Sequence, residues 1–158
     1  MQEKIRTILH EVKDPEIPVL SIEDLGILRA FSIDGNLVTV TITPTYSGCP
    51  AMNTIEDDIQ KALKNKGFDV KIITVLDPPW TTDWMSEEGK KRLEEYGIAP
   101  PQKSSVDKRT LFGKNPEVRC PHCKSMHTEL VSQFGSTACK SLYRCKDCLE
   151  PFDYFKCI

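Results

Sequence analysis

Apolar residues recur with helical or strand periodicity along the first hundred positions of the chain. In residues 2–13 they repeat every three to four positions, which predicts an amphipathic helix that ends before Pro15. Two runs rich in β-branched residues follow at 27–34 and 37–43. The Asp-Gly-Asn turn between these runs predicts a β-hairpin.

The next segment has the pattern of a second helix, a third strand and a third helix. Helical spacing predicts a helix over about 50–66, which ends at Gly67. A strand is expected at 68–76, and a helix at about 86–96. The order α-β-β-α-β-α predicts an α+β fold, a two-layer domain with a three-stranded sheet and helices on one face. We assign residues 1–98 to this domain.

Two CxxC pairs stand near the end of the chain, with 21 residues between them. Their members are Cys120, Cys123, Cys145 and Cys148. Four thiolates presented by two tight turns are the ligand set of a closed, tetrahedral structural Zn²⁺ site, although iron could occupy the same four sulfurs. The spacing predicts a small C-terminal β zinc ribbon over 117–158, which follows a polar, basic linker at 99–116.

Charge and composition exclude several classes of protein. The net charge is −2, and the acidic residues are concentrated in the first domain, whereas the zinc module is close to neutral. A nucleic-acid-binding ribbon would carry a clear basic face, so no nucleic-acid partner is expected. No apolar run is long enough to span a bilayer and no leader segment opens the chain, so we expect a cytoplasmic protein with no membrane partner.

Cys49 is the second candidate site in the chain. It stands directly before Pro50 at the predicted start of the second helix, where the helix dipole and free N–H groups favour a thiolate with a lowered pKa. Such a thiolate can bind a soft metal, attack a disulfide or act as a nucleophile. The simpler interpretation is a small buried apolar side chain.

The remaining polar candidates do not form a conventional catalytic set around Cys49. None of the three histidines, His10, His122 and His127, is placed by its sequence context as a base for this thiol. Asp14 and Glu16 could bind a metal or accept hydrogen bonds, or they could simply end the first helix. No di-iron Glu-x-x-His pair and no G-x-G-x-x-G loop is found, so the chain itself is not expected to be catalytic.

Several short motifs resemble those of the metal–sulfur cluster assembly family over about residues 1–80. They are Asp14-Pro15-Glu16 after the first helix and Thr45-x-x-x-Cys49-Pro50 at the second. Other motifs resemble one branch of that family, the PaaD (or PaaJ) type proteins encoded with bacterial phenylacetyl-CoA epoxidase as one of its subunits. These are Asp77-Pro78-Pro79-Trp80-Thr81, the run from Phe134 to Lys140, Tyr143-Arg144-Cys145, and the run from Glu150 to Lys156. With them, the resemblance covers essentially the whole chain.

The resemblance implies an accessory protein of a di-iron epoxidase that acts on an aromatic CoA thioester. Family members help to build or deliver iron–sulfur clusters, and the cysteine that corresponds to Cys49 is tied to that role. The expected partners are therefore the oxygenase and reductase subunits of the epoxidase. The resemblance also implies that Asp14, Glu16 and Thr45 belong to the candidate site for iron or a transient iron–sulfur cluster.

Other thiols and other functions stay open at this stage. One thiolate cannot hold a cluster alone, so we expect a homodimer or a partner to complete the site, with Cys139 and Cys157 as secondary candidates. The main alternative is a structural scaffold that docks on the oxygenase and carries no cluster. A thiol-redox protein that uses a CxxC pair is a third hypothesis, against which the ribbon spacing argues.

Overall fold

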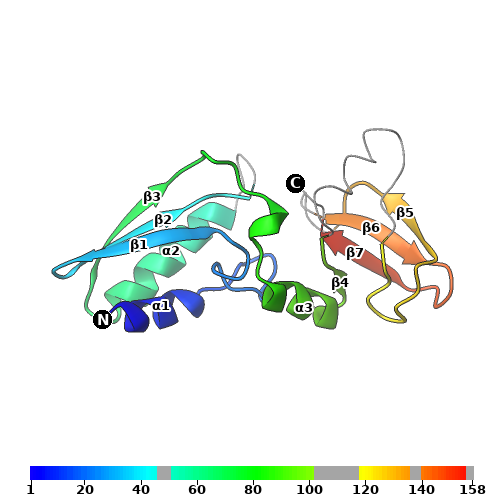
Figure 1. Cartoon of the computed structure of the whole chain (residues 1–158), viewed down its shortest axis with the longest axis horizontal. Helices are drawn as coiled ribbons and strands as arrows, with labels where there is room; N and C mark the ends of the chain where they lie inside the picture. The colour runs from blue at the N-terminus through cyan, green and yellow to red at the C-terminus, as the bar shows by residue number, and fades with distance from the viewer. Residues whose placement is uncertain (46–50, 102–117, 136–139, 156–158) are drawn as a thin grey trace. The chain divides into compact units, whose positions relative to one another are not determined.

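A computed structural model describes residues 1–45, 51–101, 118–135 and 140–155 of the chain. These residues form two compact units, Met1–Gly89 and Lys90–Ile158 (Figure 1). No helix in the described ranges is long and apolar enough to cross a membrane.

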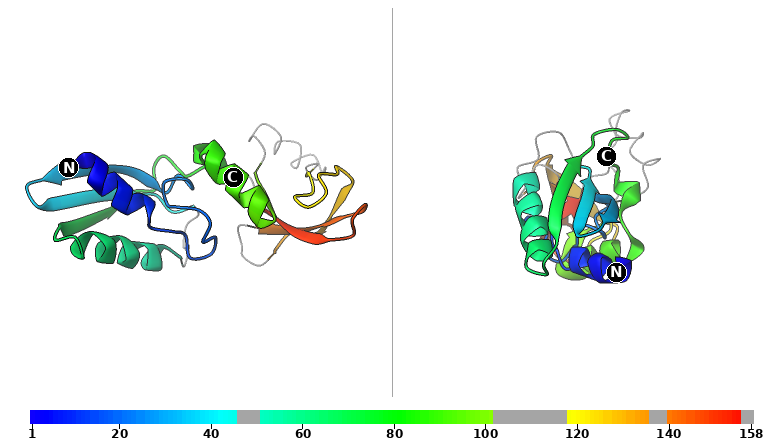
Figure 2. Two further views of the ribbon diagram at one scale, coloured as in Figure 1. Left: turned by 90° about the horizontal axis from the view of Figure 1, so that it is seen from below. Right: turned by 90° about the vertical axis from the view of Figure 1, so that its left-hand side faces the viewer.

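The N-terminal unit consists of a three-stranded sheet with two helices on one face (Figures 1 and 2). Its strands are β1 (Leu28–Asp34), β2 (Leu37–Ile42) and β3 (Asp69–Thr74), and its helices are α1 (Gln2–His10) and α2 (Ala51–Lys64). Strand β2 lies in the centre, antiparallel to β1 and parallel to β3. This arrangement confirms the α+β class and the order of elements predicted from the sequence.

The core of this unit lies between the sheet and the two helices. Strand β2 alternates between buried and more exposed residues, as a strand with one covered face must. The helices contribute apolar residues at three- and four-residue spacing, so each buries a single stripe. The central buried side chains are Ile5, Ile8 and Leu9 of α1, Val38, Val40 and Ile42 of β2, and Ile55, Ile59 and Leu63 of α2.

Helix α1 ends three residues earlier than its apolar pattern indicates. Val12 continues the apolar stripe and is buried, but its backbone carbonyl accepts from the Ile22 N–H instead of an N–H in a further helical turn. Lys13 forms an isolated antiparallel bridge with Ser21. The chain leaves the helix because residues 12–13 pair with this later segment.

The segment after β3 packs against the loop that precedes β1. Trp80 is buried, and its Nε1 donates a hydrogen bond to the Leu25 carbonyl at 2.9 Å. Gly26 has φ +81°, and a Cβ added there would lie 2.8 Å from the Trp84 Cβ and carbonyl oxygen. This glycine therefore supplies both the backbone conformation and the space that the approach of the 3₁₀ turn Thr82–Trp84 requires.

Asp24 holds the start of the third helix, α3 (Glu87–Tyr96), against the same loop. The Ser86 hydroxyl donates to Asp24 Oδ1 and accepts from the Gly89 N–H, both at 2.9 Å, so Ser86 acts as the cap of the helix. The Ser21 hydroxyl also donates to Asp24, at 2.9 Å. Asp24 is buried, and these hydroxyls supply hydrogen bonds to its two oxygens.

The C-terminal unit contains a four-stranded sheet in the order β4-β7-β6-β5 (Figure 1). The strands are β4 (Ile98–Ala99), β5 (Thr128–Ser132), β6 (Lys140–Cys145) and β7 (Pro151–Phe155). The β5, β6 and β7 strands pair antiparallel, whereas β4 adds to β7 in parallel. The division between the units falls inside α3, so its second half and β4 belong with the cysteine-containing sheet.

A small aromatic core supports this sheet. Tyr143 stacks on Phe152 with ring centroids 5.9 Å apart and meets Tyr154 edge-on at 5.6 Å. Cys120 and Cys145 are buried in the same cluster. The sequence did not predict β4, because two residues are too few to show a period. The predicted boundaries of the domains at residues 98 and 116 remain a prediction.

Candidate metal centre

Four cysteine sulfurs converge at one point in the C-terminal unit. The Sγ atoms of Cys120, Cys123, Cys145 and Cys148 all lie within 4.8 Å of one another. The Cys120 and Cys148 sulfurs are 3.8 Å apart, and those of Cys123 and Cys145 are 3.5 Å apart. Sulfurs placed tetrahedrally around zinc at about 2.3 Å lie roughly 3.8 Å from one another, so this cluster has the dimensions of a zinc site.

The two CxxC turns, here called knuckles 120–124 and 145–149, have the same local geometry. The residue after each second cysteine, Lys124 and Leu149, has φ +66°. This left-handed conformation is uncommon for residues other than glycine. In both knuckles the backbone N–H two positions after the second cysteine points at its sulfur, from Ser125 to Cys123 and from Glu150 to Cys148.

The pKa values of the thiols show why this cluster fits a divalent cation. Backbone N–H groups of Cys148 and Asp147 lower the pKa of Cys145 to about 7. At Cys148 the Glu150 N–H also favours the thiolate, but burial and the neighbouring thiols outweigh it and raise the pKa to about 12. Four sulfurs this close cannot all ionise beside one another without a cation, whereas a dication removes that repulsion. The residues therefore fit zinc as a structural ion.

The two knuckles are also joined by polar side chains outside the sulfur cluster. The Ser125 hydroxyl donates a hydrogen bond to Asp147 Oδ2. His127 Nδ1 lies 3.2 Å from the same carboxylate oxygen. Hydrogen bonds from Ser125 and His127 hold the pKa of Asp147 below its usual value. This group spans from the end of the first knuckle to the middle of the second.

Glu94 of α3 contacts the first knuckle within the C-terminal unit. Its Oε1 accepts from Arg119 at 2.7 Å and from Lys124 at 2.9 Å. Burial by itself would raise the pKa of this carboxyl, but the hydrogen bonds from Lys124 and Arg119 prevail and lower it. The helix is thereby attached on both sides of the first CxxC pair.

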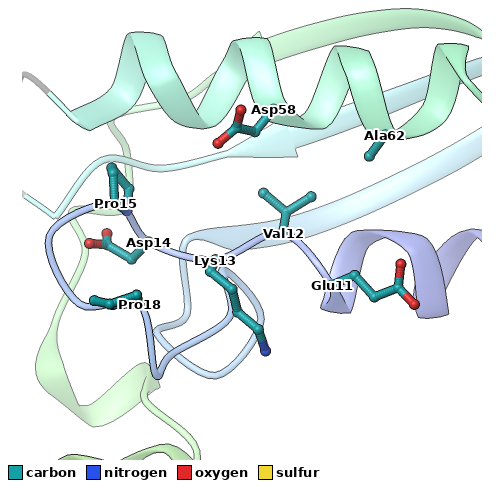
Figure 3. Close-up of a pocket in the computed structure, with 8 residues that line it drawn as sticks. All are labelled: Glu11, Val12, Lys13, Asp14, Pro15, Pro18, Asp58 and Ala62. Carbon is teal, nitrogen blue, oxygen red and sulfur yellow. The ribbon is translucent and has the colours of Figure 1, made fainter.

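A pocket in the N-terminal unit contains one of the residues predicted for the second site (Figure 3). It lies between the loop after α1 and helix α2 and has a volume of about 490 Å³. Its lining is Glu11, Val12, Lys13, Asp14, Pro15, Pro18, Asp58 and Ala62. Figure 3 shows the carboxylate of Asp58 extending from α2 on the side of the loop that carries Pro15 and Asp14.

Asp14 is fixed in this loop by backbone hydrogen bonds. Its Oδ1 accepts from the N–H groups of Glu16 at 2.8 Å and Ile17 at 2.9 Å. Its own N–H donates to the Leu20 carbonyl at 3.0 Å. The side chain is 6 % exposed, so Asp14 both shapes the loop and lines the pocket.

The other residues predicted for this site are placed only in part. Glu16 is half-buried in the same loop and does not line the pocket. Thr45 is half-buried after the end of β2. Cys49, Cys139 and Cys157 lie outside the described residues, so their part in a site stays a prediction.

Sequence reasoning missed several residues near the two candidate sites. Asp58 has no motif around it, and only its place on α2 brings it to the pocket. The Thr43 hydroxyl, two residues before Thr45, is buried and has no hydrogen-bond partner among the described residues, which is uncommon in a folded protein. Ser125 and Asp147 are 22 residues apart, and no spacing rule links them. Their positions beside the CxxC pairs were the only available signal.

Comparison with protein families divides the chain in nearly the same way as the structure. Residues 2–75 match the family model described as iron-sulfur cluster assembly protein. Residues 104–156 match the PaaD zinc beta ribbon domain. The first match covers the sheet and helices of the N-terminal unit, and the second covers all four clustered cysteines.

Several named proteins are similar to this chain. A protein of Escherichia coli (strain K12), provisionally named as the D component of 1,2-phenylacetyl-CoA epoxidase, is 51% identical over 98% of this chain and 92% of its own length. A protein of Porphyromonas gingivalis named Fe-S protein maturation auxiliary factor is 39% identical over 58% of this chain and 90% of its own. Another of that name from Bacillus subtilis, YitW, is 37% identical over 59% of this chain and 93% of its own.

Two solved structures share part of the fold of this chain. The crystal structure of a domain of unknown function, DUF59, from Bacillus anthracis matches with a TM-score of 0.54 at 30% identity, over 58% of this chain and 89% of that one. A conserved hypothetical protein of Thermotoga maritima matches with a TM-score of 0.50 at 30% identity, over 59% of this chain and 93% of that one.

The fold and the centre define a two-part protein, an assembly-type α+β domain joined to a four-cysteine zinc ribbon. Similarity along nearly the whole chain to the relative named as an epoxidase component assigns it to a particular family. The chain belongs to the PaaD family of phenylacetyl-CoA epoxidase subunits.

Proposed function

We propose that this chain is a maturation subunit of a phenylacetyl-CoA epoxidase. It assists the assembly of iron or an iron–sulfur cluster in the oxygenase or its reductase, and Cys49 is the thiol that handles this cargo. The chain carries out no step of the epoxidation itself. It works in the cytosol, where its thiols stay reduced.

One observation supports this proposal most strongly, the union of two family matches in a single chain. The N-terminal match is to iron-sulfur cluster assembly proteins, and the relatives named as Fe-S maturation factors match 58% and 59% of the chain. The C-terminal match is to the PaaD ribbon, and the relative named as an epoxidase component aligns with both parts. The combination is that expected of an assembly factor dedicated to one enzyme.

The two candidate sites suit different tasks. The four-cysteine centre is closed, so zinc there stabilises the unit and shapes a docking surface. A transfer site needs sulfur that binds a soft metal and then releases it, as a single thiolate at a helix start does. Cys49 stands two residues before α2, the helix that carries Asp58 into the pocket with Asp14. We propose that these carboxylates serve the same cargo as Cys49.

A single thiol needs further ligands from elsewhere. A second copy of the chain in a homodimer, or the recipient subunit, is proposed to supply them. Glu16 and Thr45 are proposed to belong with Asp14 to the cluster-transfer site, and Cys139 and Cys157 are the secondary thiol candidates. The recipient is proposed to be the oxygenase or the reductase subunit.

Complementation of a strain that lacks this gene tests the proposal. We expect Cys49→Ala to abolish epoxidase activity in vivo, although the purified variant keeps the circular dichroism spectrum of the wild type. Asn53→Ala, which replaces an exposed residue in the first turn of α2, is the matched control and should restore full activity. Full activity with Cys49→Ala, together with stable co-purification with the oxygenase, would instead support a scaffold that carries no cluster.

A further inference from the structure

We propose that the hydrogen bond between Ser125 and Asp147, supported by His127, is a latch that slows release of the metal from the four-cysteine centre. The three residues are positioning residues, because none of them is a ligand. The proposal concerns the structural metal site and does not depend on Cys49 or on any cargo. It rests on the fit of the four sulfurs to zinc.

The latch joins the two backbone segments that hold neighbouring sulfurs. The Ser125 N–H is directed at the sulfur of Cys123, and the Asp147 N–H is directed at the sulfur of Cys145. These two sulfurs are 3.5 Å apart. Since the side chains of Ser125 and Asp147 bond to each other, each knuckle fixes the position of the other.

The latch lies beside the more accessible part of the centre. Cys120 and Cys145 are buried, whereas Cys123 is exposed and Cys148 is half-buried. Water or a competing ligand therefore reaches the metal first near Cys123. Separation of Cys123 from Cys145 is the first opening available to the metal, and the Ser125–Asp147 bond opposes it.

His127 closes the arrangement from a third position. Its backbone N–H donates to the Ser125 hydroxyl at 3.0 Å, and its ring Nδ1 lies 3.2 Å from Asp147 Oδ2. Its carbonyl accepts from the Lys146 N–H at 2.7 Å. Main-chain and side-chain bonds thus connect residues 125–127 with residues 146–147 at several points.

The same three residue types occur in hydrolase triads, but the geometry here is different. In a triad, histidine lies between serine and aspartate and takes the proton from the hydroxyl. Here the Ser125 hydroxyl bonds directly to Asp147. His127 bonds to this hydroxyl through its backbone N–H and not through its ring. Serine is therefore not activated, and the group is suited to holding two turns together. Groups that hydrogen-bond to the ligands of a metal commonly change the affinity for the metal by about 10- to 100-fold.

Zinc release from the full-length, zinc-loaded protein tests this proposal. Transfer of zinc to an excess of a chromogenic chelator is followed by absorbance, and the first-order rate is compared among variants. We expect Ser125→Ala and Asp147→Ala each to release zinc about tenfold faster than the wild type. The double variant should be no faster than the faster single variant, because both changes break the same bond.

Two matched variants separate the latch from general damage to the ribbon. Glu129→Ala removes an exposed ion pair of the same ribbon, in which Glu129 Oε2 lies 3.7 Å from Lys146 Nζ. This variant should release zinc at the wild-type rate. Ser125→Thr keeps the hydroxyl and should also stay near the wild-type rate. Rates within twofold of the wild type for both alanine variants would overturn the proposal, as would additive effects in the double variant.

Discussion

Asp14 shows how a single side chain can have a structural part and line a candidate site. Its buried carboxylate accepts hydrogen bonds from two backbone N–H groups. Asp14 also lines the pocket beside α2. The sequence left two interpretations of Asp14 open, a ligand or hydrogen-bond partner and a residue that merely ends the helix. In the structure the helix ends at His10, and Asp14 accepts hydrogen bonds from the Glu16 and Ile17 N–H groups in the loop beyond it, whereas its part in metal binding stays a prediction.

Replacement of Asp14 should destabilise the N-terminal unit. We expect Asp14→Ala to lower its free energy of unfolding by about 1–3 kcal/mol, because the Glu16 and Ile17 N–H groups lose their acceptor. Asp14→Asn keeps an acceptor oxygen and should cost less. Asp58→Ala, in the same pocket, is the control and should change stability little. Urea denaturation of the four proteins measures this, and equal midpoints for Asp14→Ala and Asp58→Ala would contradict the structural role.

Residues with fixed spacing were predictable from the sequence, and residues brought together by the fold were not. The four metal-binding cysteines were predicted because two CxxC pairs impose their own local geometry. Asp147 was not predicted, because its partner Ser125 is distant in sequence and reaches it only when the two knuckles meet around the metal. Asp58 was missed for the same reason, since a short acidic run on a helix has no distinguishing pattern.

At the scale of elements, helix α3 is the part whose surroundings the sequence described least well. Its extent was predicted within a residue, because a serine cap and a terminal glycine delimit it. Its contact with the first knuckle was not predicted, because Glu94 bonds to Arg119 and Lys124, which lie 25 and 30 positions further along the chain. The parallel pairing of β4 with β7 likewise depends on contacts more than fifty residues apart.

The contact of Glu94 should make the stability of the C-terminal unit depend on pH. A carboxyl whose pKa is lowered on folding contributes stability above its unfolded pKa and loses it as pH falls through the folded value. We expect Glu94→Gln to cost on the order of 1 kcal/mol at pH 7. The difference from the wild type should shrink below about pH 4.5, the ordinary pKa of this carboxyl, and vanish once it is protonated.

Thermal denaturation of Glu94→Gln and of the wild type at several pH values measures how the difference in stability between them depends on pH. Comparing the two proteins at each pH removes the effect of acid on the metal-binding thiols, which both share. Glu95→Gln changes the exposed neighbour in the same helix and serves as the control. A Glu94→Gln effect that stays constant from pH 7 to pH 4 would show that the ion pairs do not stabilise the unit.

At the scale of the whole molecule, the chain consists of two units with different sources of stability. The N-terminal unit has a core between a sheet and two helices, whereas the C-terminal unit has a small aromatic core and a metal centre. Units this small commonly need a metal to fold. The sequence predicted this organisation because apolar periodicity and cysteine spacing occur in separate stretches.

Removal of zinc should therefore unfold one unit and leave the other intact. Hydrogen exchange followed by mass spectrometry, before and after treatment with a strong chelator, measures this in the full chain. We expect loss of protection in residues 140–155 and unchanged protection in α1, α2 and β2, because only the C-terminal unit depends on the centre. Simultaneous loss in both units would show that they fold as one.

We propose that the chain carries iron or a cluster through Cys49, whereas its four-cysteine centre holds zinc. The most direct test is to purify it anaerobically, reconstitute it with iron and sulfide, and measure zinc, iron and acid-labile sulfide per chain in the wild type and in Cys49→Ser. We predict about one zinc in both proteins, as a single four-ligand site requires, with iron and sulfide in the wild type alone. Equal iron and sulfide in both proteins, or none in either, would contradict the claim.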